Sequence, residues 1–159
     1  MRYRDGQATV NLLLNRASPW IDVDSYLPYE GRVQLKNKTA NSVAVRIPGW
    51  AKIEAVTCTV GAEQARPRRT GRYLTFESLR QGDEIELKFG MPDGQAEYLI
   101  NYQPYKVSFR GSTVVDVGPR KESDLFYPLY RRAHMTKGPA PMVKRQRFVS
   151  NMTEFSEAD

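Results

Sequence analysis

The chain has 159 residues, 40% hydrophobic and 26% charged, with a formal net charge of +6, which suits one globular domain or one domain with an appendage. No apolar run approaches the ~20 residues of a membrane-spanning helix, and no signal-peptide pattern follows Met1. The sequence has one cysteine, Cys58, and one histidine, His134. An internal disulfide is therefore excluded, and a zinc site with Cys and His ligands is disfavoured.

Apolar and polar residues alternate with period two along most of the chain, which predicts short β-strands. The apolar members of these predicted strands are Val10, Leu12, Leu14; Val33, Leu35; Val43, Val45, Ile47; Val56, Cys58, Val60; Leu74, Phe76; Ile85, Leu87, Phe89; Tyr98, Ile100, Tyr102; Val107, Phe109; Val115 and Val117. Turn sequences such as Pro48-Gly49 and Pro92-Asp93-Gly94 separate them. Strands at this spacing predict an antiparallel β-sandwich, jelly-roll-like, over residues 1–118.

The alternation ends at Gly118-Pro119. Residues 119–149 carry eight basic and two acidic side chains, so the basic excess of the chain lies there. We therefore expect two parts, a β-sandwich domain at 1–118 and an extended basic arm with a polar tail at 119–159. Phe126, Tyr127, Leu129 and Tyr130 are the residues expected to anchor the arm.

Four segments in order along the chain resemble glycoside hydrolase family 127, the β-L-arabinofuranosidase-like proteins. They are Val10 to Trp20, Val45-Arg46-Ile47-Pro48-Gly49-Trp50, Gly82-Asp83-Glu84-Ile85-Glu86-Leu87 and Met91-Pro92. In that family an (α/α)6 barrel carries catalysis, through a cysteine nucleophile in a zinc site of cysteines and a glutamate, and β-sandwich domains follow it. The resemblance implies that this chain corresponds to the sandwich region. One cysteine cannot supply the family's zinc site, so no catalytic residue carries over, and we expect Cys58 to be buried.

Aromatic and acidic residues gather between residues 20 and 30, at Trp20, Asp22, Asp24, Tyr26, Tyr29 and Glu30. Such a set favours contact with a sugar or with a neighbouring domain. Calcium is a second interpretation, because carboxylates are hard oxygen ligands. A plain strand with Ile21 and Val23 inward and the aspartates outward is a third. A catalytic carboxylate pair is disfavoured, because the ~6.5–7 Å between two aspartates on one strand face follows from the pleat and indicates no cleft.

Trp50 joins Trp20 as an expected interface anchor. Arg66, Arg68, Arg69 and Arg72 form a predicted basic patch, which would either bind a polyanion together with the arm or lie as a solvated loop. His134 lacks the nearby partner that triad chemistry needs. Asn37 and Asn151 each begin a glycosylation sequon.

Together these patterns predict a non-catalytic accessory domain of a glycoside-hydrolase-like protein, packed against its catalytic barrel. The alternatives are a carbohydrate-binding module that uses exposed aromatics and a basic polyanion-binding domain. No metal, cofactor or membrane partner is expected, and nucleic acid is the least favoured ligand. The compartment is open: cytoplasmic, or periplasmic or secreted if the longer protein carries a signal peptide.

Overall fold

The computed structural model describes residues 1–119, 135 and 137–143. These residues form thirteen strands and one short 3-10 turn, η1 (Ile53–Ala55). The all-β, largely antiparallel sandwich predicted from the alternation is confirmed. Within the described ranges, no helix is long and apolar enough to cross a membrane.

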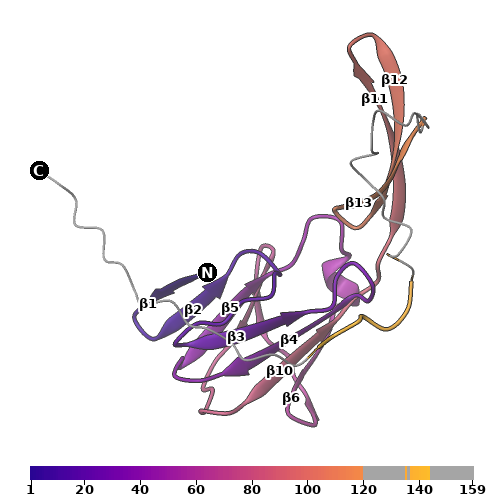
Figure 1. Cartoon of the computed structure of the whole chain (residues 1–159). Helices are drawn as coiled ribbons and strands as arrows, with labels where there is room; N and C mark the ends of the chain where they lie inside the picture. Colours follow the sequence, from indigo (N-terminus) through magenta and orange to yellow (C-terminus); the bar gives the residue numbers. More distant parts are fainter. Residues whose placement is uncertain (120–134, 136, 144–159) are drawn as a thin grey trace, which may run out of the picture.

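Two five-stranded sheets build the sandwich (Figure 1). The first has the order β1 (Arg2–Arg4), β2 (Gln7–Val10), β5 (Ser42–Arg46), β9 (Tyr73–Phe76), β8 (Arg68–Thr70). The second has the order β3 (Ile21–Ser25), β4 (Arg32–Asn37), β10 (Glu84–Lys88), β6 (Thr57–Val60), β7 (Glu63–Gln64). The chain passes repeatedly from one sheet to the other, as expected of a jelly-roll-like sandwich.

One strand pair departs from the predicted antiparallel pattern. β2 and β5 are parallel, with Val10 opposite Val45. A parallel pair needs a long crossover connection, and residues 11–41 supply it by forming β3 and β4 in the other sheet. The last residue pair in this register is Val10 with Val45. Continued by one residue, the register leads to Asn11, which follows β2, and Arg46, which ends β5.

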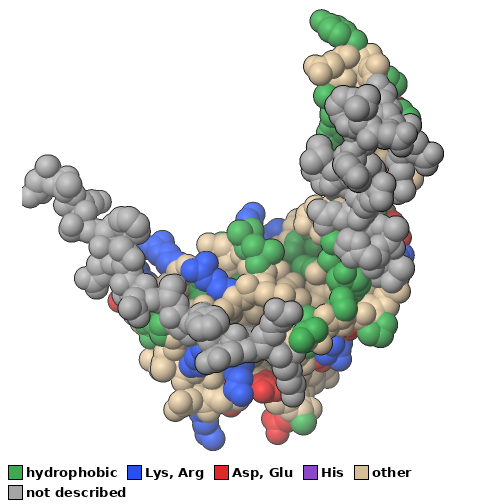
Figure 2. Space-filling model, viewed as in Figure 1, with side chains coloured by type: hydrophobic (Ala, Val, Ile, Leu, Met, Phe, Trp, Pro, Cys, Tyr) green, Lys and Arg blue, Asp and Glu red, His purple; other side chains and the backbone are tan. Residues whose placement is uncertain are grey.

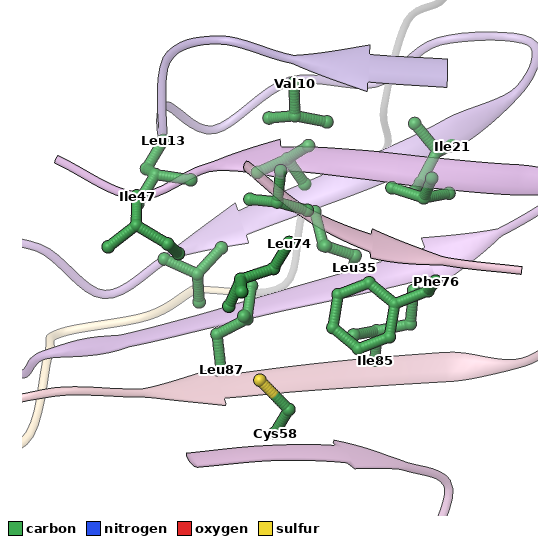
Figure 3. Close-up of a cluster of buried hydrophobic side chains, with 14 of the residues drawn as sticks. Val10, Leu13, Ile21, Leu35, Ile47, Cys58, Leu74, Phe76, Ile85 and Leu87 are labelled. Atoms are coloured by element: carbon green, nitrogen blue, oxygen red, sulfur yellow. The ribbon is translucent and has the colours of Figure 1, made fainter. Parts of the chain in front are cut away.

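The core lies between the two sheets, where buried side chains from both meet (Figure 3). On β3, Ile21 and Val23 are buried and the aspartates between them are half-buried, as the alternation predicted. Leu35 of β4 and Leu87 of β10 are fully buried beside them. Each such side chain stabilises the fold by about 1.5–3 kcal/mol.

The segment after β2 corrects one prediction. Alternation would place Leu12 and Leu14 on the same buried face as Val10, but these two leucines are 67% and 63% exposed. Leu13 is buried instead. The reason is that β2 ends at Val10, so the pleat of a strand no longer decides which side chains face the core.

The last three strands form a third sheet, here called the ribbon: β11 (Asp93–Ile100), β12 (Gln103–Arg110) and β13 (Thr113–Gly118). Among the described strands, they pair only with each other, and the ribbon projects away from the sandwich (Figure 1). The alternation near residues 98–117 predicts strands of the sandwich. Its strands are present, but they build this separate projection.

The end of the ribbon corrects a second detail. Tyr102 was predicted to continue a strand with Tyr98 and Ile100, but it lies in a two-residue hairpin turn with Asn101. The φ angles of Asn101 and Tyr102 are 49° and 61°. Positive φ at both positions is typical of a type I′ turn, in which glycine is favoured at the second.

Candidate functional site

Trp20 and Trp50, the two predicted anchors, do not lie in one site. Trp20 precedes β3, whereas the groove that contains Trp50 is lined by Ser25 at the other end of that strand and by Leu27 beyond it. Five residues of extended chain span about 16 Å. The two tryptophans therefore serve different parts of the molecule.

Trp20 is packed within the sandwich. Its ring stacks on Tyr3 of β1, with ring centroids 4.7 Å apart and planes 6° apart, so one indole face is covered. Next along the chain, Oδ1 of Asp22 lies 2.7 Å from Nζ of Lys38. This carboxylate thus faces an ammonium group, an arrangement that opposes the calcium interpretation. The described residues contain no group of three or more His, Cys, Asp or Glu arranged to hold a metal ion.

Tyr26 and Glu30 form a second cluster, centred on Arg32. The guanidinium of Arg32 lies 3.6 Å above the ring of Tyr26, and the Tyr26 hydroxyl donates to Oε1 of Gln34 at 2.7 Å. Nε of Arg32 donates to Oε2 of Glu30 at 3.0 Å. Arg32 thus covers one face of the Tyr26 ring. Tyr29, also predicted, is half-buried, and its backbone N–H donates to the carbonyl of Tyr26.

Glu30 also accepts a hydrogen bond from a late segment of the chain. The backbone N–H of Ala140 donates to its Oε1 at 2.9 Å. This hydrogen bond, together with the Arg32 guanidinium, lowers the pKa of Glu30 below its ordinary value. Glu30 therefore stays ionised and ties residues 137–143 to the sandwich.

Trp50 lies where the sandwich meets the ribbon. Its ring packs edge-on against Phe89, with centroids 5.7 Å apart. A Cβ placed on Gly111, in the β12–β13 turn, would lie 2.8 Å from its Cζ2, so only glycine lets the ribbon come this close. These contacts fix the indole in place at the joint.

The turn that carries Trp50 is held by Arg72, one of the predicted basic patch. Its Nε donates to the carbonyl of Ile47 at 2.9 Å, and its Nη2 donates to the carbonyls of Pro48 and Ala51. Three carbonyls at the end of β5 thus share one guanidinium. The role of Arg72 is to close this turn.

The other predicted basic residues are arranged as separate pairs. Arg68 pairs with Glu77, and Arg69 pairs with Glu54, each with N and O atoms 3.0 Å apart. Arg66 is exposed. Exposed pairs of this kind contribute little to stability. They do reduce the local positive potential on which the polyanion hypothesis depends.

Trp50 forms one wall of a groove of about 410 Å³, the joint groove. Its lining residues come from four separate parts of the sequence: 11–15, 25 and 27, 46 and 48–50, and 112–113. The sequence analysis found only Trp50 among them. The other lining residues are brought together by the parallel pairing of β2 with β5 and by the β12–β13 turn, which lies beside Trp50. No short sequence motif predicts either arrangement.

Three further sequence predictions concern single residues. Cys58 is buried as expected, and burial raises the pKa of its thiol to about 11. The side chain of Asn37 is 1% exposed and donates to the carbonyls of Ala40 and Arg80, so this sequon has a structural role. His134, Asn151 and the anchor residues of the arm lie outside the described residues.

Comparison with known proteins gives matches among solved structures only. No family model and no curated protein matches the chain. A glycoside hydrolase matches at 23% identity and a TM-score of 0.45, over 59% of this chain and 17% of its own. A GH127 β-L-arabinofuranosidase from Geobacillus stearothermophilus T6 matches at 23% and 0.45, over 59% and 16%. A further GH127 β-arabinofuranosidase matches at 19% and 0.44, over 59% and 18%.

The chain thus covers less than a fifth of the length of each of these structures. The family of the two arabinofuranosidases is the one that the sequence motifs resemble.

Proposed function

We propose that this chain is a non-catalytic accessory domain of a larger glycoside-hydrolase-like protein and that it packs against the catalytic barrel through its ribbon. The observation that carries the proposal is the exposed apolar end of the ribbon. Tyr102, Leu99 and Ile100 are 96%, 71% and 53% exposed. Figure 2 shows hydrophobic side chains gathered at this end, away from the sandwich.

The ribbon has two chemically different faces. In the β11–β12 register, Tyr98 lies opposite Tyr105 and Ala96 opposite Val107, on one face. The residues between them are mostly polar or charged, including the opposed pairs Glu97 with Lys106 and Asp93 with Arg110 on the other face. The apolar face is exposed toward the end of the ribbon, at Tyr98 and Ile100, and Leu99 adds an exposed apolar side chain to the other face there, so this end favours burial against a partner.

Tyr102 strengthens this interpretation because the backbone there suits glycine. A φ of 61° is unfavourable for a residue with a Cβ, by roughly 1–2 kcal/mol. The chain nevertheless carries a large aromatic side chain at the most exposed point of the turn. Residues held in such a conformation are concentrated at functional sites, and tyrosine is enriched among interface anchors.

The barrel is the proposed partner because the sequence motifs resemble a family in which a sandwich accompanies such a barrel. The short length of the chain relative to the matched structures accords with a part of a larger protein. The sole cysteine, Cys58, is buried in the sandwich, where its neutral thiol suits packing rather than nucleophilic attack. These observations support a structural role for the chain.

Titration calorimetry tests the docking. The 159-residue chain is mixed with the (α/α)6 barrel of a GH127 enzyme prepared without its own sandwich domains. We expect binding, at least tenfold weaker for Tyr102→Gly and for Leu99→Asn. Tyr102→Gly creates the Asn-Gly pair that type I′ turns prefer, so the hairpin itself is kept.

Leu12→Asn is the matched control, because Leu12 is as exposed as Leu99 but lies outside the ribbon. Its effect on binding should be less than twofold. Absence of binding, or equal losses for Leu12→Asn and Leu99→Asn, would refute docking through the ribbon. Hydrolysis of an aryl arabinofuranoside by the isolated chain would refute the non-catalytic role.

A further inference from the structure

We infer that the joint groove binds a saccharide that carries a carboxylate, such as a uronic acid. This inference is independent of the proposed docking, because the groove lies at the base of the ribbon and the docking residues lie at its far end. A volume of about 410 Å³ falls within the range of small-molecule sites. The groove thus has room for one or two sugar rings.

Trp50 supplies a flat apolar surface in this groove. The C–H groups on one side of a sugar ring pack well against an indole, which presents a large rigid face at little entropic cost. The contacts with Phe89 and with the turn at Gly111 already hold the Trp50 ring. Binding would therefore not have to order this side chain.

The polar lining of the groove is rich in donors. Oδ1 of Asn15 accepts from the backbone N–H of Ser25 at 2.6 Å, and Oδ1 of Asn11 accepts from the hydroxyl of Tyr73 at 3.0 Å. Both amides line the groove, and with their oxygens engaged they can offer N–H groups to a ligand. Such a surface suits a ligand with many oxygen acceptors.

The side chain of Arg46 favours an acidic sugar over a neutral one as the ligand of the groove. It is exposed, lines the groove and lies beside Asn11 through the parallel register of β2 and β5. No aspartate or glutamate is among the described residues that line the groove. A guanidinium that meets no carboxylate among these described lining residues is suited to a paired hydrogen bond with a carboxylate of the ligand.

Ser25 adds an unsatisfied group beside the groove. It lines the groove and is 6% exposed, and its Oγ has no hydrogen-bond partner among the described residues. A buried hydroxyl without a partner is unfavourable, and such exceptions call for an explanation. The Oγ itself is closed to solvent, so Ser25 contributes a buried polar wall of the groove rather than a direct contact with the ligand.

The experiment is titration calorimetry of the 159-residue chain with trigalacturonate. Its methyl ester, with the same shape but no charge, and an acidic hexapeptide are the comparison ligands. We expect trigalacturonate to bind, and both comparison ligands to bind at least tenfold more weakly. Equal binding of the methyl ester would refute the role of the ligand carboxylate. Equal binding of the acidic hexapeptide would refute specificity for a saccharide.

Two pairs of variants place the site. Arg46→Met should weaken binding at least tenfold, whereas Arg66→Met, which removes the same charge from an exposed loop, should change it less than twofold. Gly49 lines the groove and has open space around an added Cβ, so Gly49→Phe should block the groove without strain. Gly90→Phe is its control, because Gly90 has equal space but does not line the groove.

The variants are first compared with the parent chain by circular dichroism and thermal unfolding, so that a loss of binding is not a loss of fold. Absence of trigalacturonate binding at millimolar concentration would overturn the inference. Equal losses within either pair of variants would also overturn it, because binding would then depend on overall charge or on bulk rather than on the joint groove.

Discussion

The guanidinium of Arg72 closes the turn between β5 and Trp50. The residue stands in a run of arginines that by sequence suggests a charged surface, yet its hydrogen bonds go to three backbone carbonyls of one turn. Hydrogen bonds from a charged donor are stronger than those between neutral groups. The position of Trp50, and with it the wall of the joint groove, depends on this side chain.

We predict that Arg72→Met lowers the free energy of unfolding by about 2 kcal/mol, because the carbonyls lose a charged donor while the apolar stem is kept. Urea denaturation followed by tryptophan fluorescence measures this loss. Arg66→Met is the control and should lie within about 0.5 kcal/mol of the parent chain. Equal stability of the two variants would contradict the role given to Arg72.

At this scale the sequence identified residues whose contacts it could not specify. Cys58 was predicted to be buried, which the structure confirms. The contact roles of Trp50 and Tyr26 stay predictions, and Arg32 covers one face of the Tyr26 ring. Composition and spacing identify an aromatic residue, but they do not show which side chain lies on its face.

Among the elements, the ribbon differs most from the expectation. Its three strands follow the predicted alternation, but they pair with each other and project from the sandwich. The close approach of Gly111 to Trp50 sets where the projection begins. A substitution at Gly111 therefore tests whether this contact fixes the position of the ribbon on the sandwich.

We predict that Gly111→Ala destabilises the chain more than Gly61→Ala does. The two glycines have φ angles of 58° and 59°, so alanine carries the same backbone penalty of about 1 kcal/mol at both. Only at Gly111 would the new Cβ meet a ring, and overpacking adds about 1–3 kcal/mol.

Calorimetric melting temperatures compare the two glycine variants, and amide exchange in β12 and β13 reports on the ribbon itself. The exchange of these amides should accelerate in Gly111→Ala and stay unchanged in Gly61→Ala. Equal melting temperatures and equal exchange would show that the contact with Trp50 does not seat the ribbon.

Across the whole molecule, residues 135 and 137–143 contact both the ribbon and the sandwich. Nη1 of Arg110 donates to the carbonyl of Met135, and Lys137 pairs with Asp93 at the base of the ribbon. The backbone N–H of Ala140 then donates a hydrogen bond to Oε1 of Glu30 on the sandwich. The division into a domain at 1–118 and an arm at 119–159 stays a prediction, because most of the arm lies outside the described residues.

We predict a pH-dependent contact at Glu30. Its pKa is lowered in the folded chain, so its contribution is present above the ordinary value near 4.5 and is lost as the pH falls and the carboxylate is protonated. Glu30→Gln should therefore reduce exchange protection of the Ala140 amide at pH 7, and the difference from the parent chain should shrink as the pH falls through the lowered pKa of Glu30.

Nuclear magnetic resonance of the Ala140 amide measures this difference between the parent chain and the variant at each pH. Glu77→Gln is the control, because it removes an exposed paired carboxylate elsewhere. Equal protection of Ala140 in the parent chain and in Glu30→Gln at pH 7 would contradict the tether.

The sequence by itself determined the class of fold and most of the core. Alternation such as Ile21-Asp22-Val23-Asp24 states which side chains face inward wherever a strand is regular, because side chains in a strand alternate between its two faces. Where the strand ends, as after Val10, this rule no longer applies, and Leu12 and Leu14 were assigned to the wrong side.

Only the tertiary structure decided the joint groove and the separation of the ribbon. The groove needs Asn11 near Arg46, which the parallel pairing of β2 with β5 provides, and Trp50 beside Gly111, which the packing of the β12–β13 turn on the sandwich provides. Such pairing depends on the packing of the whole molecule, and local residue patterns do not record it.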